Sequence, residues 1–204
     1  MHSSLRPFVL PMAACAILAG SPALAQSTLD KVKSSGSISL AYRESSIPFS
    51  YLDDKAKPVG FGVEICDRIV DEIKKVTGRA DLKVERQAVT SANRIPLVVN
   101  GTVDLECGST TNNSDRAKQV AFAINYFYTG TRFLVKADGG IKGLADLNNK
   151  VMVSTTGTTN FRIMRNLITE QKLPIELLGA KDHSESALLV ESSRAAAFAL
   201  ARRP

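Results

Sequence analysis

The sequence predicts an α/β fold built on parallel strands, and two observations support this prediction. First, segments with the two-residue periodicity of half-buried strands alternate along the chain with helical segments, an order typical of parallel sheets. Second, several helical segments are bounded by residues that favour helix ends, with a hydroxyl before the first turn or a glycine after the last. With 204 residues, 44% of them hydrophobic, the chain is long enough for one sizeable domain or two small lobes.

Residues 1–25 are predicted to be a signal peptide. Arg6 supplies a positive charge, the run Phe8–Gly20 is largely apolar, and Ala23-Leu24-Ala25 fits the small-residue pattern of a cleavage site. Cleavage before Gln26 would export the mature protein, so we predict a periplasmic location. No later stretch reaches the roughly 18 apolar residues that a membrane span requires.

The first half of the mature chain alternates between helices and strands. The longest helical pattern has apolar residues at positions 65, 69, 73 and 76, a spacing that predicts an amphipathic helix ended by Gly78. In chain order the predicted elements are a helix Ser27–Ser35 stopped by Gly36, a strand Ser37–Tyr42, the helix Val63–Val76, a strand Leu82–Val89, a helix Pro96–Asn100 and a strand Thr102–Glu106.

The second half continues the alternation after the apolar and aromatic stretch Ala121–Tyr128. Its predicted elements are an extended segment Thr129–Val135, a short helix Leu144–Leu147, a strand Lys150–Val153, a helix that begins near Phe161, a strand Ile175–Leu178, a helix capped by Ala180–Ser186, and a strand-like run Ser193–Leu200.

An arginine and nearby hydroxyls follow each of the first three predicted strands. A polar hairpin loop would explain the last cluster, and Arg43 could instead pair with Glu44 or solvent, but ligands of open α/β sheets bind outside the carboxyl ends of the strands. A guanidinium matches the two oxygens of a carboxylate, and hydroxyls satisfy the remaining lone pairs. The recurrence therefore predicts a converging anion site formed by Arg43 with Ser45 and Ser46, Arg94 with Ser91, and Arg116 with Ser109 and Thr111.

Two segments of the second half could contribute to the same site. The hydroxyl-rich loop 154–160, which contains Thr159, precedes a helix and suits a carboxylate; it lacks the G-K-[ST] ending of a P-loop, so nucleotide binding is not expected. His183 could donate to an anion or could be a solvated cap residue. Both interpretations are left open.

Few residues support metal, redox or nucleic-acid chemistry. The two cysteines after the signal peptide, Cys66 and Cys107, could pair in an oxidising compartment, or either could stay a buried thiol. His183 is the only histidine after the signal peptide, so neither a metal site, a Cys-His catalytic pair nor a cofactor is expected.

The formal charge of +6 favours an anionic ligand but fits a merely soluble basic surface equally well. Because the charges are dispersed, nucleic-acid binding is not expected.

Five motifs, which lie in order between Thr28 and Phe198, resemble the periplasmic glutamate/aspartate-binding proteins of ABC importers, in solute-binding protein family 3. They are R-E-S-S-x-P-F-S-Y (43–51), T-S-x-N-R-I-P-L (90–97), N-G-T-x-D-x-E-C-G-S-T-T-N-N (100–113), T-G-T-T (156–159) and A-K-D-H (180–183).

The resemblance implies a two-lobe clamshell of type II, with lobe 1 at residues 26–130 and lobe 2 at 131–204. It also implies a monomer that closes on L-glutamate or L-aspartate and is recognised by an inner-membrane permease. Arg94 and His183, with help from Arg43, would bind the side-chain carboxylate of the ligand. Arg116, Thr111 and Thr159 would bind its α-carboxylate. The full implied ligand set is Arg43, Ser91, Arg94, Ser109, Thr111, Arg116, Thr159 and His183.

The chain departs from the family pattern at its end. Ala201 stands where the resemblance leads us to expect an aspartate that anchors the ligand's ammonium group, and Arg202 follows it. Family members also continue further and complete the second lobe, so we expect an incomplete second lobe and impaired binding. The alternatives are a dehydratase-like periplasmic enzyme on the same fold, with Glu106 as an acid or base that lacks an evident partner, or a non-functional gene fragment.

Overall fold

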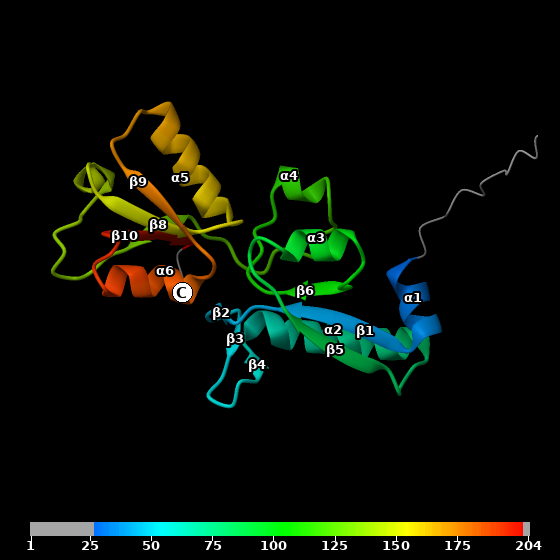
Figure 1. The fold of residues 1–204 in the computed structure, drawn as a ribbon. Coiled ribbons are helices and arrows are strands. Elements are labelled where there is room, and N and C mark those ends of the chain that lie inside the picture. Colours follow the sequence, from blue (N-terminus) through cyan, green and yellow to red (C-terminus); the bar gives the residue numbers. More distant parts are fainter. Residues whose placement is uncertain (1–26, 202–204) are drawn as a thin grey trace, which may run out of the picture.

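The computed structural model describes residues 27–201 as two α/β bodies side by side (Figure 1). Their strands form three separate sheets, in the orders β5-β1-β6, β7-β10-β8-β9 and β2-β3-β4. The predicted α/β class is therefore confirmed. The predicted signal peptide, residues 1–25, lies outside the described residues. Within residues 27–201, no helix has both the length and the apolar character needed to cross a membrane.

The first body contains a parallel sheet in which β1 pairs with β5 on one side and with β6 on the other. The predicted helices and strands occur in the predicted order, with three further short strands between β1 and α2. The elements are α1 (Thr28–Ser35), β1 (Ser37–Tyr42), β2 (Ser45–Ser46), β3 (Ser50–Leu52), β4 (Pro58–Val59), α2 (Phe61–Thr77), β5 (Lys83–Ala88), α3 (Arg94–Val99), β6 (Leu105–Cys107) and α4 (Ser114–Ala117).

The second body contains a mixed sheet, in which β8 is parallel to both β9 and β10 while β7 is antiparallel to β10. The elements are β7 (Thr131–Leu134), the 3₁₀ helix η1 (Leu144–Leu147), β8 (Val151–Thr155), α5 (Thr159–Glu170), β9 (Glu176–Ala180), α6 (His183–Glu191) and β10 (Ala197–Ala201). No strand of one body pairs with a strand of the other among the described residues. The lobe boundary at residue 130 stays a prediction.

Side-chain caps fix the helix ends that the sequence predicts. The hydroxyl of Ser27 accepts a hydrogen bond from the backbone N–H of Asp30 at the start of α1, and Thr158 does the same for Phe161 at the start of α5. Gly78 ends α2 in the left-handed conformation, with φ 68°. The cap at Thr158 sets the end of the loop before α5, and Thr158 lines the site described below.

The predicted amphipathic helix ended by Gly78 is confirmed as α2, but its stripe at 65, 69, 73 and 76 is not the most buried one. The buried apolar residues of α2 are Val63, Cys66 and Val70, of which Cys66 and Val70 pack in the core with β1 and β6. The isoleucines at 65, 69 and 73 are only half-buried, and Val76 is 72% exposed. They line an open apolar groove of about 420 Å³ beside α1. The helix carries two adjacent apolar stripes, and periodicity alone did not identify the one that faces the sheet.

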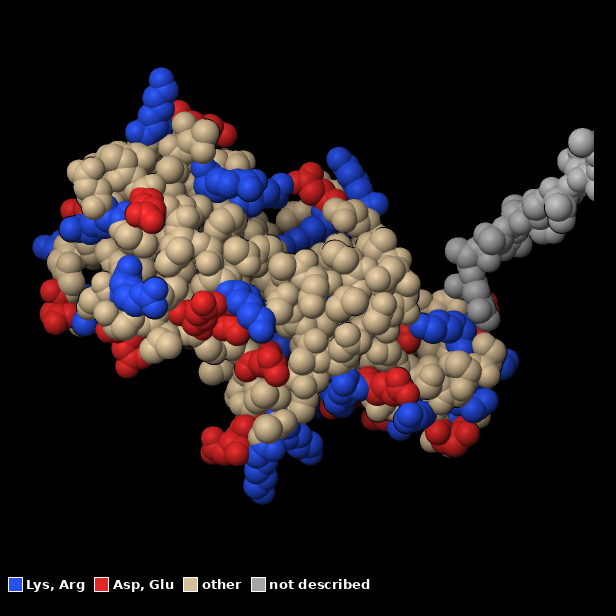
Figure 2. Space-filling view, viewed as in Figure 1, with Lys and Arg blue, Asp and Glu red and all other residues tan. Residues whose placement is uncertain are grey.

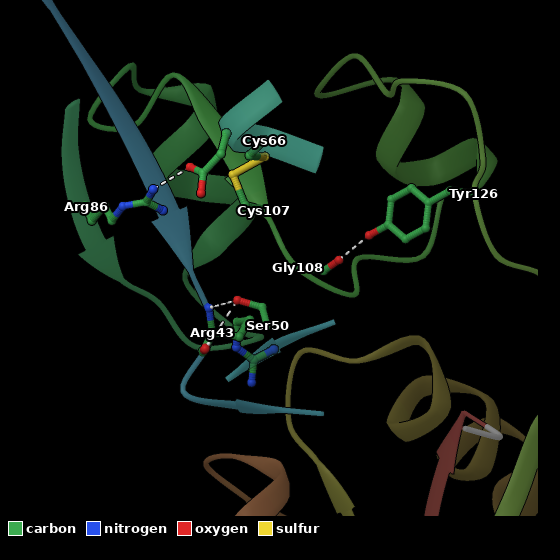
Figure 3. The surroundings of a disulfide bond; sticks show 8 residues. Arg43, Ser50, Cys66, Arg86, Cys107, Gly108 and Tyr126 are labelled. Atoms are coloured by element: carbon green, nitrogen blue, oxygen red, sulfur yellow. Dashed lines mark hydrogen bonds and ion pairs between the residues drawn. A yellow bond between two sulfur atoms is a disulfide. The ribbon is translucent and has the colours of Figure 1, made fainter. Parts of the chain in front are cut away.

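Cys66 and Cys107 form a disulfide that joins α2 to β6 (Figure 3). Their Cα atoms lie 5.9 Å apart, and 41 residues separate them in the sequence. Both cysteines are almost completely buried in the core of the first body. The alternative of a free buried thiol is thereby excluded for this structure.

Replacing both cysteines by alanine is expected to lower the free energy of unfolding by about 2–4 kcal/mol, because the bridge closes a long loop of the unfolded chain. Urea denaturation of the wild type and the double variant would measure this. A reducing agent should destabilise the wild type by a similar amount and leave the double variant unchanged. Equal midpoints for the oxidised wild type and the double variant would contradict the prediction.

Candidate functional site

The two bodies face each other across a small cleft of about 50 Å³. It lies next to the ends of β1, β8 and β10, at the junction of the two bodies visible in Figure 1. The lining residues are mainly hydroxyl-bearing and aliphatic, with one guanidinium and one imidazole: Ser46, Ile47, Phe49, Arg94, Ser109, Thr111, Thr158, Thr159, Asn160, His183, Leu200 and Ala201. No carboxylate is among them, so the described lining favours an anion over a cation.

Arg43 follows β1 and is only 1% exposed. Its guanidinium Nη1 donates to the Ser91 hydroxyl at 2.7 Å, and its backbone N–H donates to the hydroxyl of Ser50 at 2.8 Å (Figure 3). Burial lowers the pKa of Arg43 to about 10, and the positive charge of Arg94 acts in the same direction. Two buried cations therefore lie close to each other, Arg94 in the wall of the cleft and Arg43 beside it.

Arg94 is the first residue of α3 and is only 2% exposed. Its Nη1 lies 3.6 Å from Oε1 of Glu106, within ion-pair range but too far for a hydrogen bond. Burial lowers the pKa of Arg94, and the carboxylate of Glu106 partly opposes this shift. Glu106 therefore provides a negative charge beside Arg94.

Arg116 lies on α4 and reaches the second body. Its guanidinium donates to the carbonyl of Thr111 at 2.9 Å and to the carbonyl of Gly157 at 3.0 Å. Partial burial lowers the pKa of Arg116 to about 10, and the charge of Arg94 lowers it further. The third arginine therefore joins the same group of cations, at the edge where the two bodies meet.

The second body contributes Thr159 and His183 to the cleft. Thr159 is the first residue of α5, and its hydroxyl accepts from the amide of Asn113 on the first body at 3.4 Å. His183 is the first residue of α6, and its Nδ1 lies 2.7 Å from the hydroxyl of Thr155. These contacts fix both side chains at the rim that faces the arginines.

Buried polar atoms without a hydrogen bond are concentrated around this cleft. Within the described residues they are Nε of Arg43, Oγ of Ser45, Oγ of Ser46, Nε and Nη1 of Arg94, Oε1 of Glu106 and Oγ1 of Thr110. A buried polar atom left unsatisfied costs about 1–3 kcal/mol, so native proteins rarely collect several in one place. Such a collection indicates a site built to bind a polar molecule.

The predicted ligand residues therefore come together, although not all in the same role. Five of them line the cleft: Arg94, Ser109, Thr111, Thr159 and His183. Arg43 and Ser91 are buried and hydrogen-bonded to each other, and Arg116 bridges the two bodies. That these eight residues bind a ligand stays a prediction.

The sequence did not identify Tyr126 as part of the site. Its hydroxyl donates to the carbonyl of Gly108 (Figure 3), and its ring contacts Phe49 and Phe61. Burial raises the pKa of Tyr126 to about 12, and the negative charge of Glu106 contributes. The only sequence signal for Tyr126 was its place in an aromatic stretch, which is a weak signal.

Within residues 27–201, no group of His, Cys, Asp or Glu side chains could hold a metal ion.

Gly157 lies where the loop before α5 meets the first body. Its φ is +74°, and an added Cβ would lie 2.5 Å from Cα of Ala92. Gly157→Ala is expected to lower the free energy of unfolding by about 2–4 kcal/mol, since it combines a left-handed alanine with a backbone collision. Gly140→Ala is the matched control, with φ +70° and no atom within 4 Å. We expect about 1–2 kcal/mol for the control, measured by denaturation. Equal losses would contradict a contact between the bodies.

On the face shown in Figure 2, basic and acidic side chains are interspersed over both bodies. They do not gather there into one continuous basic surface. The concentration of positive charge instead lies inside, in the buried and half-buried arginines 43, 94 and 116. A small anion that enters the cleft would meet this charge with little water between them.

Comparison with known proteins identifies relatives of this chain. The family of bacterial extracellular solute-binding proteins, family 3, matches residues 38–196. The L-glutamate/L-aspartate-binding protein of Pseudomonas aeruginosa is 44% identical over 95% of this chain. The glutamate/aspartate import solute-binding protein of Escherichia coli is 48% identical over 85% of it. The alignments span 66% and 58% of these two relatives, so the chain covers about three fifths of their length.

Solved structures with the same fold include the solute receptor for L-cysteine of Neisseria gonorrhoeae. Its TM-score is 0.73 at 27% identity, over 86% of this chain and 68% of the receptor. An ancestral amino acid-binding protein, a precursor of cyclohexadienyl dehydratase, gives the same score and identity over 86% of this chain and 74% of the other. These similarities confirm the predicted type II clamshell fold of the solute-binding proteins.

Proposed function

The chain belongs to the bacterial extracellular solute-binding proteins of family 3, and on this premise we propose that it captures glutamate or aspartate and delivers it to an ABC permease. The observation that supports this most directly is the group of unsatisfied buried polar atoms beside three arginines. Such a site suits a small ligand with two carboxylates, because each can accept charge-assisted hydrogen bonds from a guanidinium. The names of the relatives agree with this ligand class.

Each carboxylate has its own partners in this proposal. Arg94 and His183, with Arg43 behind them, bind the side-chain carboxylate. Arg116 binds the α-carboxylate together with Thr111 and Thr159. Ser91 fixes Arg43 through its 2.7 Å hydrogen bond, and Ser109 adds a hydroxyl to the wall of the cleft.

The ligand joins the two bodies in this proposal. Arg94 and Arg116 come from the first body, whereas Thr159 and His183 come from the second. A ligand bound to both sets favours the arrangement in which the bodies approach, and this arrangement is what the permease would recognise. We place the protein in the periplasm as a monomer that binds its ligand without chemical change.

Titration calorimetry of the mature chain, residues 26–204, tests the proposal. We expect weak binding of glutamate and aspartate, because the described lining of the cleft offers no carboxylate to the ligand's ammonium group. Both should still bind in preference to glutamine, because only the acidic ligands present a second carboxylate to Arg94. Equal affinities for glutamate and glutamine, or no binding of any of the three, would contradict it. Chromatography of the recovered ligand tests the enzyme alternative, since a dehydratase-like activity would return a changed molecule.

A further inference from the structure

We propose that Glu106 is a positioning residue that sets the net charge of the cleft and thereby the ligand charge that the cleft prefers. This inference rests on the proposed function, which assigns the arginines to an acidic ligand. It goes beyond that function because Glu106 is not among the residues that line the cleft and acts through Arg94, with which it forms an ion pair.

Glu106 is held in a space that the chain leaves open for it. Its side chain is only 13% exposed, and its Oε1 has no hydrogen-bond partner. A Cβ added at Gly108 would collide with this oxygen and would lie 3.1 Å from Cγ of Arg43. The glycine two residues after Glu106 therefore lets the carboxylate fold back beside the arginines. Any larger residue at position 108 would displace it.

The position of Glu106 affects all three cations. Its negative charge favours the protonated form of Arg43, of Arg94 and of Arg116, and so opposes the lowering of each pKa by burial. Arg94 also lowers the pKa of the other two arginines, because like charges repel. Within the described part of the chain, Glu106 is the carboxylate that forms an ion pair with Arg94. It lets the cations share one site in the ligand-free protein.

One unit of negative charge beside the cleft also weakens the binding of anions. The effect grows with the net charge of the ligand, which is about −2 for glutarate, −1 for glutamate and zero for glutamine at neutral pH. Neutralising Glu106 should therefore favour glutarate most and leave glutamine almost unchanged. A loss of structure would instead weaken all three ligands together.

The test compares Glu106→Gln with the wild type and with Glu64→Gln, which removes the same charge from an exposed position on α2. Calorimetry with glutarate, glutamate and glutamine gives the affinity ratios. We expect the preference for glutarate over glutamate to rise on the order of tenfold in Glu106→Gln, and to stay unchanged in Glu64→Gln. Glu106→Asp keeps the charge and should keep a ratio near that of the wild type. An equal loss for all three ligands, or an unchanged ratio, would overturn the proposal.

A second measurement decides the role of Glu106 even if no ligand binds. In thermal denaturation without ligand, Glu106→Gln is expected to melt at a lower temperature than Glu64→Gln, because the buried cations lose their counter-charge. Millimolar sulfate should recover more of this loss in Glu106→Gln than in Glu64→Gln. Equal melting temperatures of the two variants would overturn the proposal, whereas a wild type that binds none of the three ligands would contradict the proposed function alone.

Discussion

Replacing Ala201 by aspartate is expected to strengthen glutamate binding by at least about a hundredfold. Ala201 ends β10 and lines the cleft, whose described lining contains no carboxylate. A ligand ammonium group that enters beside the arginines is therefore left without an opposite charge, at a cost of roughly 3–5 kcal/mol. Calorimetric titration of the variant with glutamate measures the gain.

Glutarate is the matched ligand for this test, because it carries both carboxylates and no ammonium group. Its affinity should fall in Ala201→Asp, since the new charge repels it. Ala201→Asn has nearly the same shape without the charge and should give little gain for either ligand. A similar gain for glutarate and glutamate would show that position 201 does not face the ammonium group.

Replacing Arg94 by methionine, in the Ala201→Asp background, is expected to reduce glutamate affinity by at least about a hundredfold. The guanidinium is almost completely buried and lines the cleft, so its loss leaves a ligand carboxylate without a charged donor. Removing one partner of a buried charge pair costs about 3–5 kcal/mol. Arg94→Lys keeps the charge without the planar fork and should lose about tenfold.

Arg86→Met is the control for the Arg94 variants. Arg86 lies on β5 of the same body and pairs with Asp67 at the surface. Exposed ion pairs contribute about 0–1 kcal/mol to stability, so both affinity and stability should change little. Affinities measured by calorimetry on chains with matching circular dichroism spectra would separate ligand loss from misfolding. A loss in Arg86→Met as large as that in Arg94→Met would contradict the assignment.

The elements with strong local signals were predicted closely. The strand Ser37–Tyr42 has the predicted bounds. Gly36 ends α1 and Gly78 ends α2, as predicted. The convergence of arginines 43, 94 and 116 was also predictable, because residues that follow parallel strands meet at one edge of a sheet. In both cases the physical cause acts within a few residues or through a general rule of topology.

Features that depend on distant packing were missed. Strands β2, β3 and β4 have only two or three residues, too few for a periodic pattern. The helix predicted over Pro96–Asn100 instead spans Arg94–Val99, after a turn in which Thr90 and Asn93 exchange hydrogen bonds. Glu106 was considered only as an acid or base. Its contact with Arg94 joins two elements that no local pattern connects.

The disulfide between α2 and β6 has a mechanical consequence for a clamshell. Ser109, which lines the cleft, follows Cys107 by two residues. The disulfide therefore ties this part of the cleft wall covalently to α2, the longest described helix of the first body. This part of the wall cannot shift independently of α2. In the closure proposed above, the first body would therefore move as one rigid unit that carries the three arginines.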